Sequence, residues 1–270
     1  MKSVVVVFSF FSVAILWLIF GIRHMQGTQA VTTDADGSAR PVVVELFTSE
    51  GCSSCPPADA LLARLDDQER VGNAEVIALE EHVDYWDQLG WRDPFSGAQW
   101  TARQQEYANS FGNDGVYTPQ MVVDGRAEFV GSSQGKAKSA IVEAAVQPKA
   151  EVVLTRLDGS TEKAHIRIAV AKLSSATTRD AQVWLAVTET GLHSNVKAGE
   201  NSGQDLHHAA VVRSLRKIGD AKAGKDVAYS VEQEVRLDSA WKRENLRVVV
   251  LVQDPKSRHI LGAASLRLKQ

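Results

Sequence analysis

The chain has 270 residues, enough for one or two domains, and its 44% hydrophobic content is ordinary for a packed globular protein. The formal net charge is −3, and the Lys and Arg residues are scattered instead of clustered on one element. Proteins that bind nucleic acid carry a concentrated basic surface, so the composition argues against that class.

The N-terminus predicts export. An unbroken apolar run spans residues 4–20, between Lys2 and Arg23. Its length lies between the core of a signal peptide and a membrane-spanning helix, which needs about 20 residues. Small residues before position 31 suit cleavage after Ala30, whereas an uncleaved run would anchor the chain to the inner membrane. Both alternatives stay open, and both put the rest of the chain in the periplasm or outside the cell, where a disulfide persists.

The next stretch predicts a strand, a turn and a helix. The apolar run over residues 42–47 is continuous instead of alternating, which is typical of a strand covered on both faces. Gly51 ends the run, and a helical apolar pattern then extends from Ala58 to Leu65. Two prolines precede that pattern, in the first helical turn, where proline costs no hydrogen bond.

Two cysteines lie at the start of this helix, and they are the only cysteines in the chain. Unpaired N–H groups at a helix N-terminus stabilise a thiolate, so Cys52 is the candidate nucleophile, at an exposed lip of the helix. Cys55 lies about one turn further on and is the candidate resolving thiol. Structural zinc would require two more ligands, and the sequence has no second cysteine pair. An inert structural disulfide remains an alternative.

A second strand, at residues 75–79, completes a β-α-β unit. Such units are parallel and right-handed, so the end of this strand should lie on the same edge of the sheet as Cys52. His82, Asp84 and Trp86 leave that edge and are the candidate residues of a substrate groove.

Three more elements follow. Ser96 and Gln99 have the spacing of a capping box for a helix over residues 97–111. Asp124 and Gly125 between two apolar runs predict a two-residue hairpin. A last helix is expected over residues 133–146.

The order of these elements resembles that of thioredoxin-like proteins, with Thr118-Pro119 where that fold carries its cis-proline. The segments 45–55, 82–86 and 117–121, with 199–203 further on, resemble a family of secreted bacterial proteins that has a thioredoxin-like first domain and no assigned function. The resemblance covers most of the chain. It implies an α/β thioredoxin-like domain with redox activity, in which Thr118 and Pro119 shape the groove beside the cysteines.

Glu45 also stands out, because a carboxylate within a doubly buried strand is costly unless it is hydrogen-bonded or protonated. It resembles the buried acid that thioredoxins place behind their cysteines. A proton relay and a merely hydrogen-bonded buried acid both stay open. The sequence departs from thioredoxin in having Ser-Ser between the cysteines, no tryptophan before Cys52, and a second domain.

The second half of the chain predicts an all-β antiparallel sandwich. Short runs with alternating hydrophobicity are separated by turn residues. These runs cover residues 151–156, 165–171, 182–188, 209–215, 227–237, 246–252 and 260–268. The polar segment 197–208 ends in His207 and His208 and is expected to be a solvated loop, or else a contact for a substrate or metal.

The predicted organisation is therefore a signal peptide or anchor over residues 1–30, a thioredoxin-like domain with a helical insert over 31–148, and a sandwich-like domain over 149–270. The expected function is an exported thiol-disulfide oxidoreductase that acts on protein thiols or disulfides and uses no cofactor.

Two alternatives remain for the cysteines. A periplasmic Cu(I) carrier would use Cys52, Cys55 and His82, since two thiolates and an imidazole suit a soft cation. A non-catalytic binding module would use the disulfide only as a staple.

Overall fold

The computed structural model describes residues 30–31, 39–160 and 162–268. The predicted export segment 4–20 lies outside them, and the first described residues form the short strand β1 (Ala30–Val31). Within the described part of the chain, no helix is both long enough and apolar enough to pass through a bilayer.

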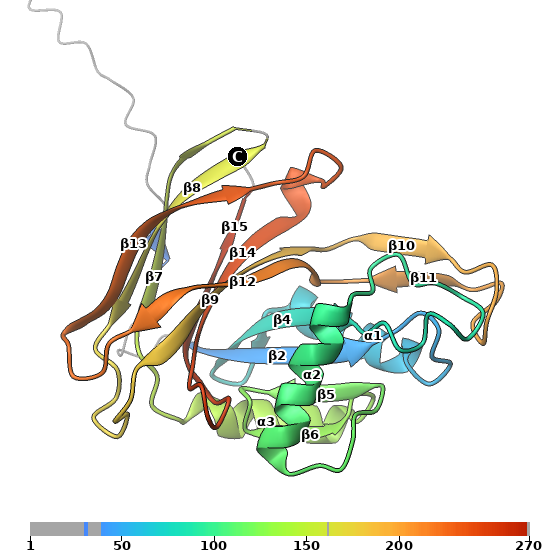
Figure 1. The fold of residues 1–270 in the computed structure, drawn as a ribbon, viewed down its shortest axis with the longest axis horizontal. Helices are drawn as coiled ribbons and strands as arrows, with labels where there is room; N and C mark the ends of the chain where they lie inside the picture. The colour runs from blue at the N-terminus through green and yellow to red at the C-terminus, as the bar shows by residue number, and fades with distance from the viewer. Residues whose placement is uncertain (1–29, 32–38, 161, 269–270) are drawn as a thin grey trace, which may run out of the picture.

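A mixed sheet of nine strands dominates the molecule (Figure 1). Eight strands follow one another in the order β15, β14, β9, β12, β4, β2, β5, β6, and β3 pairs with β4. Their bounds are β2 (Arg40–Thr48), β3 (Arg70–Val71), β4 (Ala74–His82), β5 (Gln120–Val123), β6 (Ala127–Val130), β9 (Ala181–Glu189), β12 (Val211–Ala221), β14 (Leu246–Gln253) and β15 (Ile260–Arg267).

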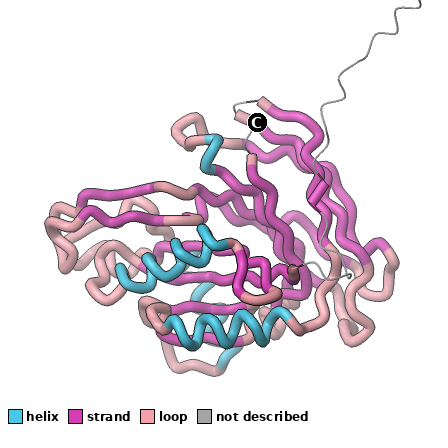
Figure 2. Tube along the Cα trace, turned by 180° about the vertical axis from the view of Figure 1, so that it is seen from behind, coloured by secondary structure: helices cyan, strands magenta, loops and turns pink. Residues whose placement is uncertain are grey.

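Helices cover both faces of one end of this sheet. Helices α1 (Pro56–Gln68) and α3 (Gln134–Ala145) lie on one face, and α2 (Ala98–Phe111) lies on the other (Figures 1 and 2). Strand β2 is buried from residue 41 to residue 48, as the continuous apolar run predicts. Prolines occupy the first two positions of α1, which confirms the predicted helix start.

The two central strands fix which side chains share a face. β2 and β4 are parallel, with Leu46 opposite Glu80 and Thr48 opposite His82. Leu46 packs with α1 and α3, so Glu80 and His82 lie on the α1 face of the sheet. Phe47 packs instead against Tyr107 of α2.

Two local predictions have different outcomes. The hairpin between β5 and β6 is confirmed, but its loop has three residues, Asp124 to Arg126, and not two, since Val123 pairs with Ala127. Asp124 and Gly125 both have positive φ. The capping box is wrong. Gly97 is the N-cap of α2 and no side chain caps it, while the Ser96 hydroxyl donates to the Asp87 carboxylate at 2.7 Å.

A second sheet packs on the other end of the large one. It contains β1, β7 (Val152–Gly159), β8 (Lys163–Ala171) and β13 (Val227–Arg236) in that order. Alternate side chains of β8 point inward, and the core between the sheets includes Leu154, Ile166, Ile168, Leu185 and Val250.

The predicted α/β thioredoxin-like domain followed by a separate sandwich is wrong. The fold is mostly β, and one sheet runs through both halves of the chain. β12 pairs in parallel with β4, with Val211 opposite Glu80, and the Glu80 N–H donates to the Ala210 carbonyl at 2.9 Å. Hydrophobic alternation identifies strands and their buried faces, but it does not identify their partners. Here β12 covers the edge of β4 that would otherwise present unpaired backbone groups.

A hairpin absent from the sequence prediction completes the fold. β10 (Leu192–Asn195) and β11 (Asp205–His208) form a two-stranded sheet that projects toward the start of α1 (Figure 1). Its connecting segment, Val196 to Gln204, is called the cap loop below.

The contact between the two halves can be tested at Gly125. A Cβ built on Gly125 would lie 2.0 Å from the Arg258 carbonyl oxygen, in the turn between β14 and β15. Gly224 also has positive φ, but a Cβ there would meet nothing within 4 Å. Both substitutions by alanine carry the cost of a left-handed conformation, about 1–2 kcal/mol. Gly125→Ala should lower the free energy of unfolding by roughly 1–3 kcal/mol more, because it also forces two backbone segments apart.

Urea unfolding of the two variants and the wild type measures this difference. Equal losses of stability would mean that the hairpin and the turn are not in contact in solution.

Candidate functional site

The cysteine turn, residues 49–55, connects β2 to α1. A disulfide joins Cys52 to Cys55, and Cys55 is the N-cap residue of α1. Both cysteines are fully buried, whereas Ser53 and Ser54 between them are exposed. The prediction that Cys52 lies at an exposed lip of the helix is therefore wrong for this state of the protein.

The cap loop binds the backbone of the cysteine turn. The Asn201 side chain donates hydrogen bonds to the carbonyls of Glu50 and Cys52, at 2.8 and 3.0 Å. The neighbouring Glu200 carboxylate accepts the Ser53 N–H at 2.9 Å. These hydrogen bonds from Ser53 hold the pKa of Glu200 below its usual value. Residues about 150 positions later in the chain thus bind the backbone around the disulfide, which the sequence pattern does not reveal.

The segment after β4 borders the cysteine turn, as the β-α-β topology predicts. A Cβ built on Gly51 would lie 3.0 Å from the Trp86 Cβ. The Trp86 indole donates to the Thr118 hydroxyl at 2.8 Å. The Thr118-Pro119 peptide bond is cis, as predicted. Three of the predicted groove residues, Trp86, Thr118 and Pro119, therefore lie together near the cysteines.

Asp84 is oriented elsewhere. Its carboxylate accepts the hydroxyl of Thr101 in α2 at 2.6 Å, and its backbone N–H donates to the same hydroxyl oxygen. This pair joins the end of β4 to α2.

Glu45 lies on the face of the sheet opposite α1. Its carboxylate accepts Arg103 Nε at 2.6 Å and also accepts the Tyr107 hydroxyl, both from α2. Burial, only partly offset by Arg103, raises the pKa of the neighbouring Glu81 carboxyl well above its usual range. The structure thus places Glu45 in a buried ion-pair network of α2, away from the helix that carries Cys55.

The buried acid on the cysteine side is Asp59. It lies in α1 four residues after Cys55 and accepts the Thr48 hydroxyl at 2.6 Å. Burial and the charge of Glu80 raise the pKa of Asp59 to about 7. The sequence contains a signal for this residue, because the spacing of Cys55 and Asp59 puts them on the same side of a helix.

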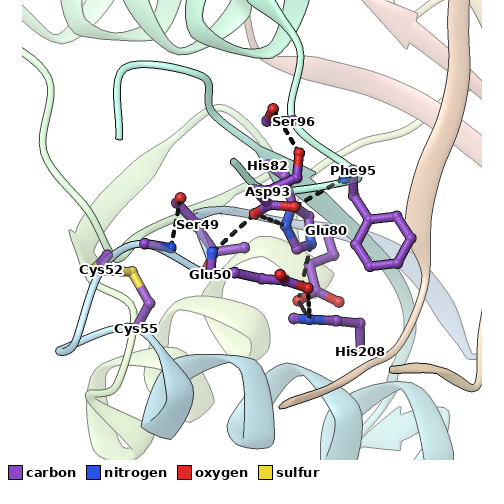
Figure 3. Close-up of polar contacts among 12 residues, drawn as sticks. Ser49, Glu50, Cys52, Cys55, Glu80, His82, Asp93, Phe95, Ser96 and His208 are labelled. Atoms are coloured by element: carbon purple, nitrogen blue, oxygen red, sulfur yellow. Dashed lines mark hydrogen bonds and ion pairs between the residues drawn. A yellow bond between two sulfur atoms is a disulfide. The ribbon is translucent and has the colours of Figure 1, made fainter. Parts of the chain in front are cut away.

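A second buried group, the histidine cluster, adjoins the cysteine turn (Figure 3). It consists of Glu50, Glu80, His82, Asp93 and His208. His208 contacts Glu80 through Nδ1 at 2.9 Å and Glu50 through Nε2 at 3.1 Å. His82 contacts Asp93 through Nδ1 at 2.7 Å. Asp93 also accepts the Glu50 N–H at 2.8 Å, which ties the cluster to the cysteine turn.

Carboxylates dominate the electrostatics of this cluster. Burial opposes a charged His82, but Asp93 and Glu80 outweigh it and raise the pKa of His82 well above its usual value. Burial likewise opposes a charged His208, yet Glu80 and Glu50 raise its pKa to about 9. Of these five residues, the sequence analysis singled out only the two histidines.

A solvent-open cavity of about 630 Å³ lies away from both groups. Its lining includes Arg126, Arg179, Asp254 and His259, and no residue of the cysteine turn or the histidine cluster.

Residues 43–253 match the model of a family described as a protein of unknown function, DUF1223. The chain belongs to the DUF1223 family. The matched region includes both the cysteine turn and the cap loop. No curated protein matches the sequence.

Two solved structures are similar to this DUF1223 protein. Protein AGR_C_4864 from Agrobacterium tumefaciens is 25% identical, with a TM-score of 0.63 over 86% of this chain and 96% of that one. HBP35 of Porphyromonas gingivalis is 17% identical, with a TM-score of 0.62 over 86% of this chain and 76% of that one. The second likeness concerns the fold alone.

The cap loop can be loosened at Asn201. Asn201→Ala removes two hydrogen bonds to the cysteine turn, each contributing about 1 kcal/mol. We expect dithiothreitol to reduce the disulfide roughly tenfold faster or more in this variant, because the cap loop leaves the sulfurs more often. Thiol quantification over time measures the rate. Ser202→Ala is the matched control, since its hydroxyl donates only to the Lys197 carbonyl within the cap loop. Equal rates for all three proteins would show that the cap loop does not limit access.

Asp59 gives the protein a pH-dependent stability. Its folded pKa of about 7 lies above the usual aspartate value of 3.8, so its contribution to stability is fully present at low pH and is lost as the pH rises to about 7. Asp59→Asn keeps an acceptor for Thr48 and cannot ionise. The wild type should therefore lose more unfolding free energy than Asp59→Asn between about pH 4 and pH 7.

Urea unfolding at several pH values tests this, with the exposed Asp67 of the same helix replaced by Asn as the control. Parallel curves for the wild type and Asp59→Asn would contradict the raised pKa.

Proposed function

We propose that this DUF1223 protein is a thiol-disulfide oxidoreductase of the extracytoplasmic space, with Cys52–Cys55 as its active disulfide. The observation that carries the proposal is the position of this bond at the N-terminus of α1. A thiolate released there is stabilised by unpaired N–H groups and the positive end of the helix dipole. A disulfide placed only to staple two segments requires no helix N-terminus.

The exchange starts with a substrate thiolate that attacks Cys52 Sγ. The S–S bond breaks, a mixed disulfide forms, and the electron pair goes to Cys55 Sγ, which takes a proton from Asp59. A second substrate thiolate then attacks the substrate sulfur of the mixed disulfide and releases Cys52 as a thiolate. Two thiols become one disulfide and the protein gains two electrons. The reverse sequence reduces a substrate disulfide.

Asp59 suits this role because its pKa of about 7 lets it both hold and release a proton near neutral pH. It is buried, and its backbone N–H donates to the Cys55 carbonyl at 3.1 Å. It takes the place that the sequence analysis gave to Glu45.

Both cysteines are buried and the cap loop binds the Cys52 carbonyl, so we infer that the sulfurs become accessible when the cap loop moves. The segments that would then border the opened disulfide are those of Trp86 and of Thr118 and Pro119. A proline there offers no N–H and an apolar face, so a substrate chain would pair with the Thr118 backbone.

Two features of the sequence support the proposed extracytoplasmic compartment. The apolar run 4–20 is of a length suited to export or anchoring. A disulfide also persists in an oxidising compartment, where protein thiols and disulfides are the available partners.

Cys55→Ser should trap the first intermediate. Mixed with glutathione disulfide, this variant should form a stable adduct on Cys52, because the resolving thiol is gone. Mass spectrometry before and after reduction identifies the adduct and its site. Cys52→Ser is the matched control and should form markedly less adduct, since Cys55 is the proposed resolving thiol and not the attacking one.

A glutathione titration of the wild type measures the reduction potential of the Cys52–Cys55 disulfide, which distinguishes an active disulfide from a structural one. A reduction potential below about −300 mV, with no adduct on Cys55→Ser, would mark the bond as a structural staple and overturn the proposal.

A further inference from the structure

Three side chains of the histidine cluster direct ligand atoms toward one point. These atoms belong to Glu80, His82 and His208, and all lie within 4.8 Å of one another. His82 Nε2 is buried, makes no hydrogen bond within the described part of the chain, and lies 3.5 Å from Glu80 Oε1. The two imidazole rings are nearly perpendicular, with their centroids 4.7 Å apart. We propose that Glu80, His82 and His208 form a binding site for a divalent transition-metal ion.

The surroundings of the three ligands support this assignment. Each ligand is held through its other polar atom, and the facing atoms lie against one another, with His208 Nδ1 at 2.9 Å and His82 Nε2 at 3.5 Å from Glu80 Oε1. A bound ion would replace the contact between His208 Nδ1 and Glu80 Oε1. Asp93 holds His82 Nδ1 at 2.7 Å, and Glu50 holds His208 Nε2 at 3.1 Å. The Ala209 N–H holds Glu80 Oε2 at 2.9 Å. Metal-binding histidines nearly always have such a carboxylate or carbonyl partner on the second nitrogen, which fixes the tautomer and the ring orientation.

The fold makes the site rigid. Glu80 and His82 come from β4, two residues apart on one face, and His208 comes from the end of β11. The Phe95 ring packs edge-on against both imidazoles, with centroids 5.4 and 5.5 Å away. An apolar wall of this kind limits water at a metal site.

The donor set selects the class of ion. Two imidazole nitrogens and one carboxylate oxygen suit zinc or iron(II) and leave a coordination position open. Calcium and magnesium prefer oxygen ligands alone. Copper(I) prefers sulfur, and within the described residues the sulfurs of Cys52 and Cys55 are not part of this group. The cluster also places three carboxylates around two imidazoles. This negative charge favours a doubly charged metal ion over a singly charged one.

The metal site does not require the proposed redox activity. Its three ligands come from β4 and β11, and neither sulfur is among them. This separates the proposal from the Cu(I) carrier that would use Cys52, Cys55 and His82.

The test uses the purified full-length chain without a polyhistidine tag, dialysed against Zn(II) or Co(II). We expect one ion per chain by elemental analysis, a higher Tm with Zn(II), and Co(II) absorption bands of a nitrogen- and oxygen-ligated centre. His82→Asn keeps a donor toward Asp93, and His208→Gln keeps one toward Glu50, but each removes the facing nitrogen. Both variants should lose the bound ion and the Tm increase.

Two matched controls decide between this site and others. His193 and His207 stack on the exposed face of the same hairpin beside Asp205, and replacing both by Ala should leave the stoichiometry at one. The double variant Cys52→Ser, Cys55→Ser should also keep its ion. Loss of the ion in either control would overturn the assignment.

Folding does not obscure the outcome. If His82→Asn or His208→Gln fails to fold, as judged by circular dichroism, the wild-type Co(II) spectrum and stoichiometry still decide. A wild type that binds no stoichiometric Zn(II) or Co(II) would overturn the proposal.

Discussion

Both the fold and the site depend on the buried Glu80. Its backbone N–H donates to the Ala210 carbonyl and its Oε2 accepts the Ala209 N–H, so one residue bonds twice to the link between β11 and β12. Its other oxygen contacts His208. A buried carboxylate is costly unless its oxygens are satisfied, and the chain from 208 to 210 supplies a hydrogen-bond partner for each of them. Ala210 has a left-handed φ of 56°, a conformation that persists because the surrounding bonds hold it.

Local chemistry made about half of the fold predictable. The continuous apolar run predicted β2, two prolines predicted the start of α1, and Asp124-Gly125 predicted the β5–β6 hairpin. Each of these signals acts over a few residues. The pairing of β4 with β12 was not predictable in this way, because Glu80 and Val211, which it joins, lie far apart in the sequence. The two-domain prediction came from the resemblance to thioredoxin-like proteins. That resemblance did not indicate that a later strand pairs with the edge of β4.

The site was predictable to the extent that it is local. The two cysteines and the approach of the segment after β4 came from sequence, but the assignment of the buried acid depended on strand register. Side chains alternate along β2, so Glu45 shares the face of Phe47 and faces α2, while the α1 face belongs to Thr48. A continuous apolar run hides this alternation. Most residues of the cap loop are exposed, as expected of a solvated loop, but its buried Asn201 binds the cysteine turn, a contact that no local pattern indicates.

The β10–β11 hairpin is held in different ways at its two ends. Its base is fixed by the contacts of His208 with Glu50 and Glu80, where breaking one partner would leave a buried charge unpaired at a cost of several kcal/mol. Its tip is held on the cysteine turn by two neutral hydrogen bonds from Asn201, which contribute about 1 kcal/mol each, and by the exposed Glu200, whose contact with Ser53 is screened by solvent. The tip can therefore release the cysteine turn while the base stays in place, and a metal ion on His208 would strengthen the base alone.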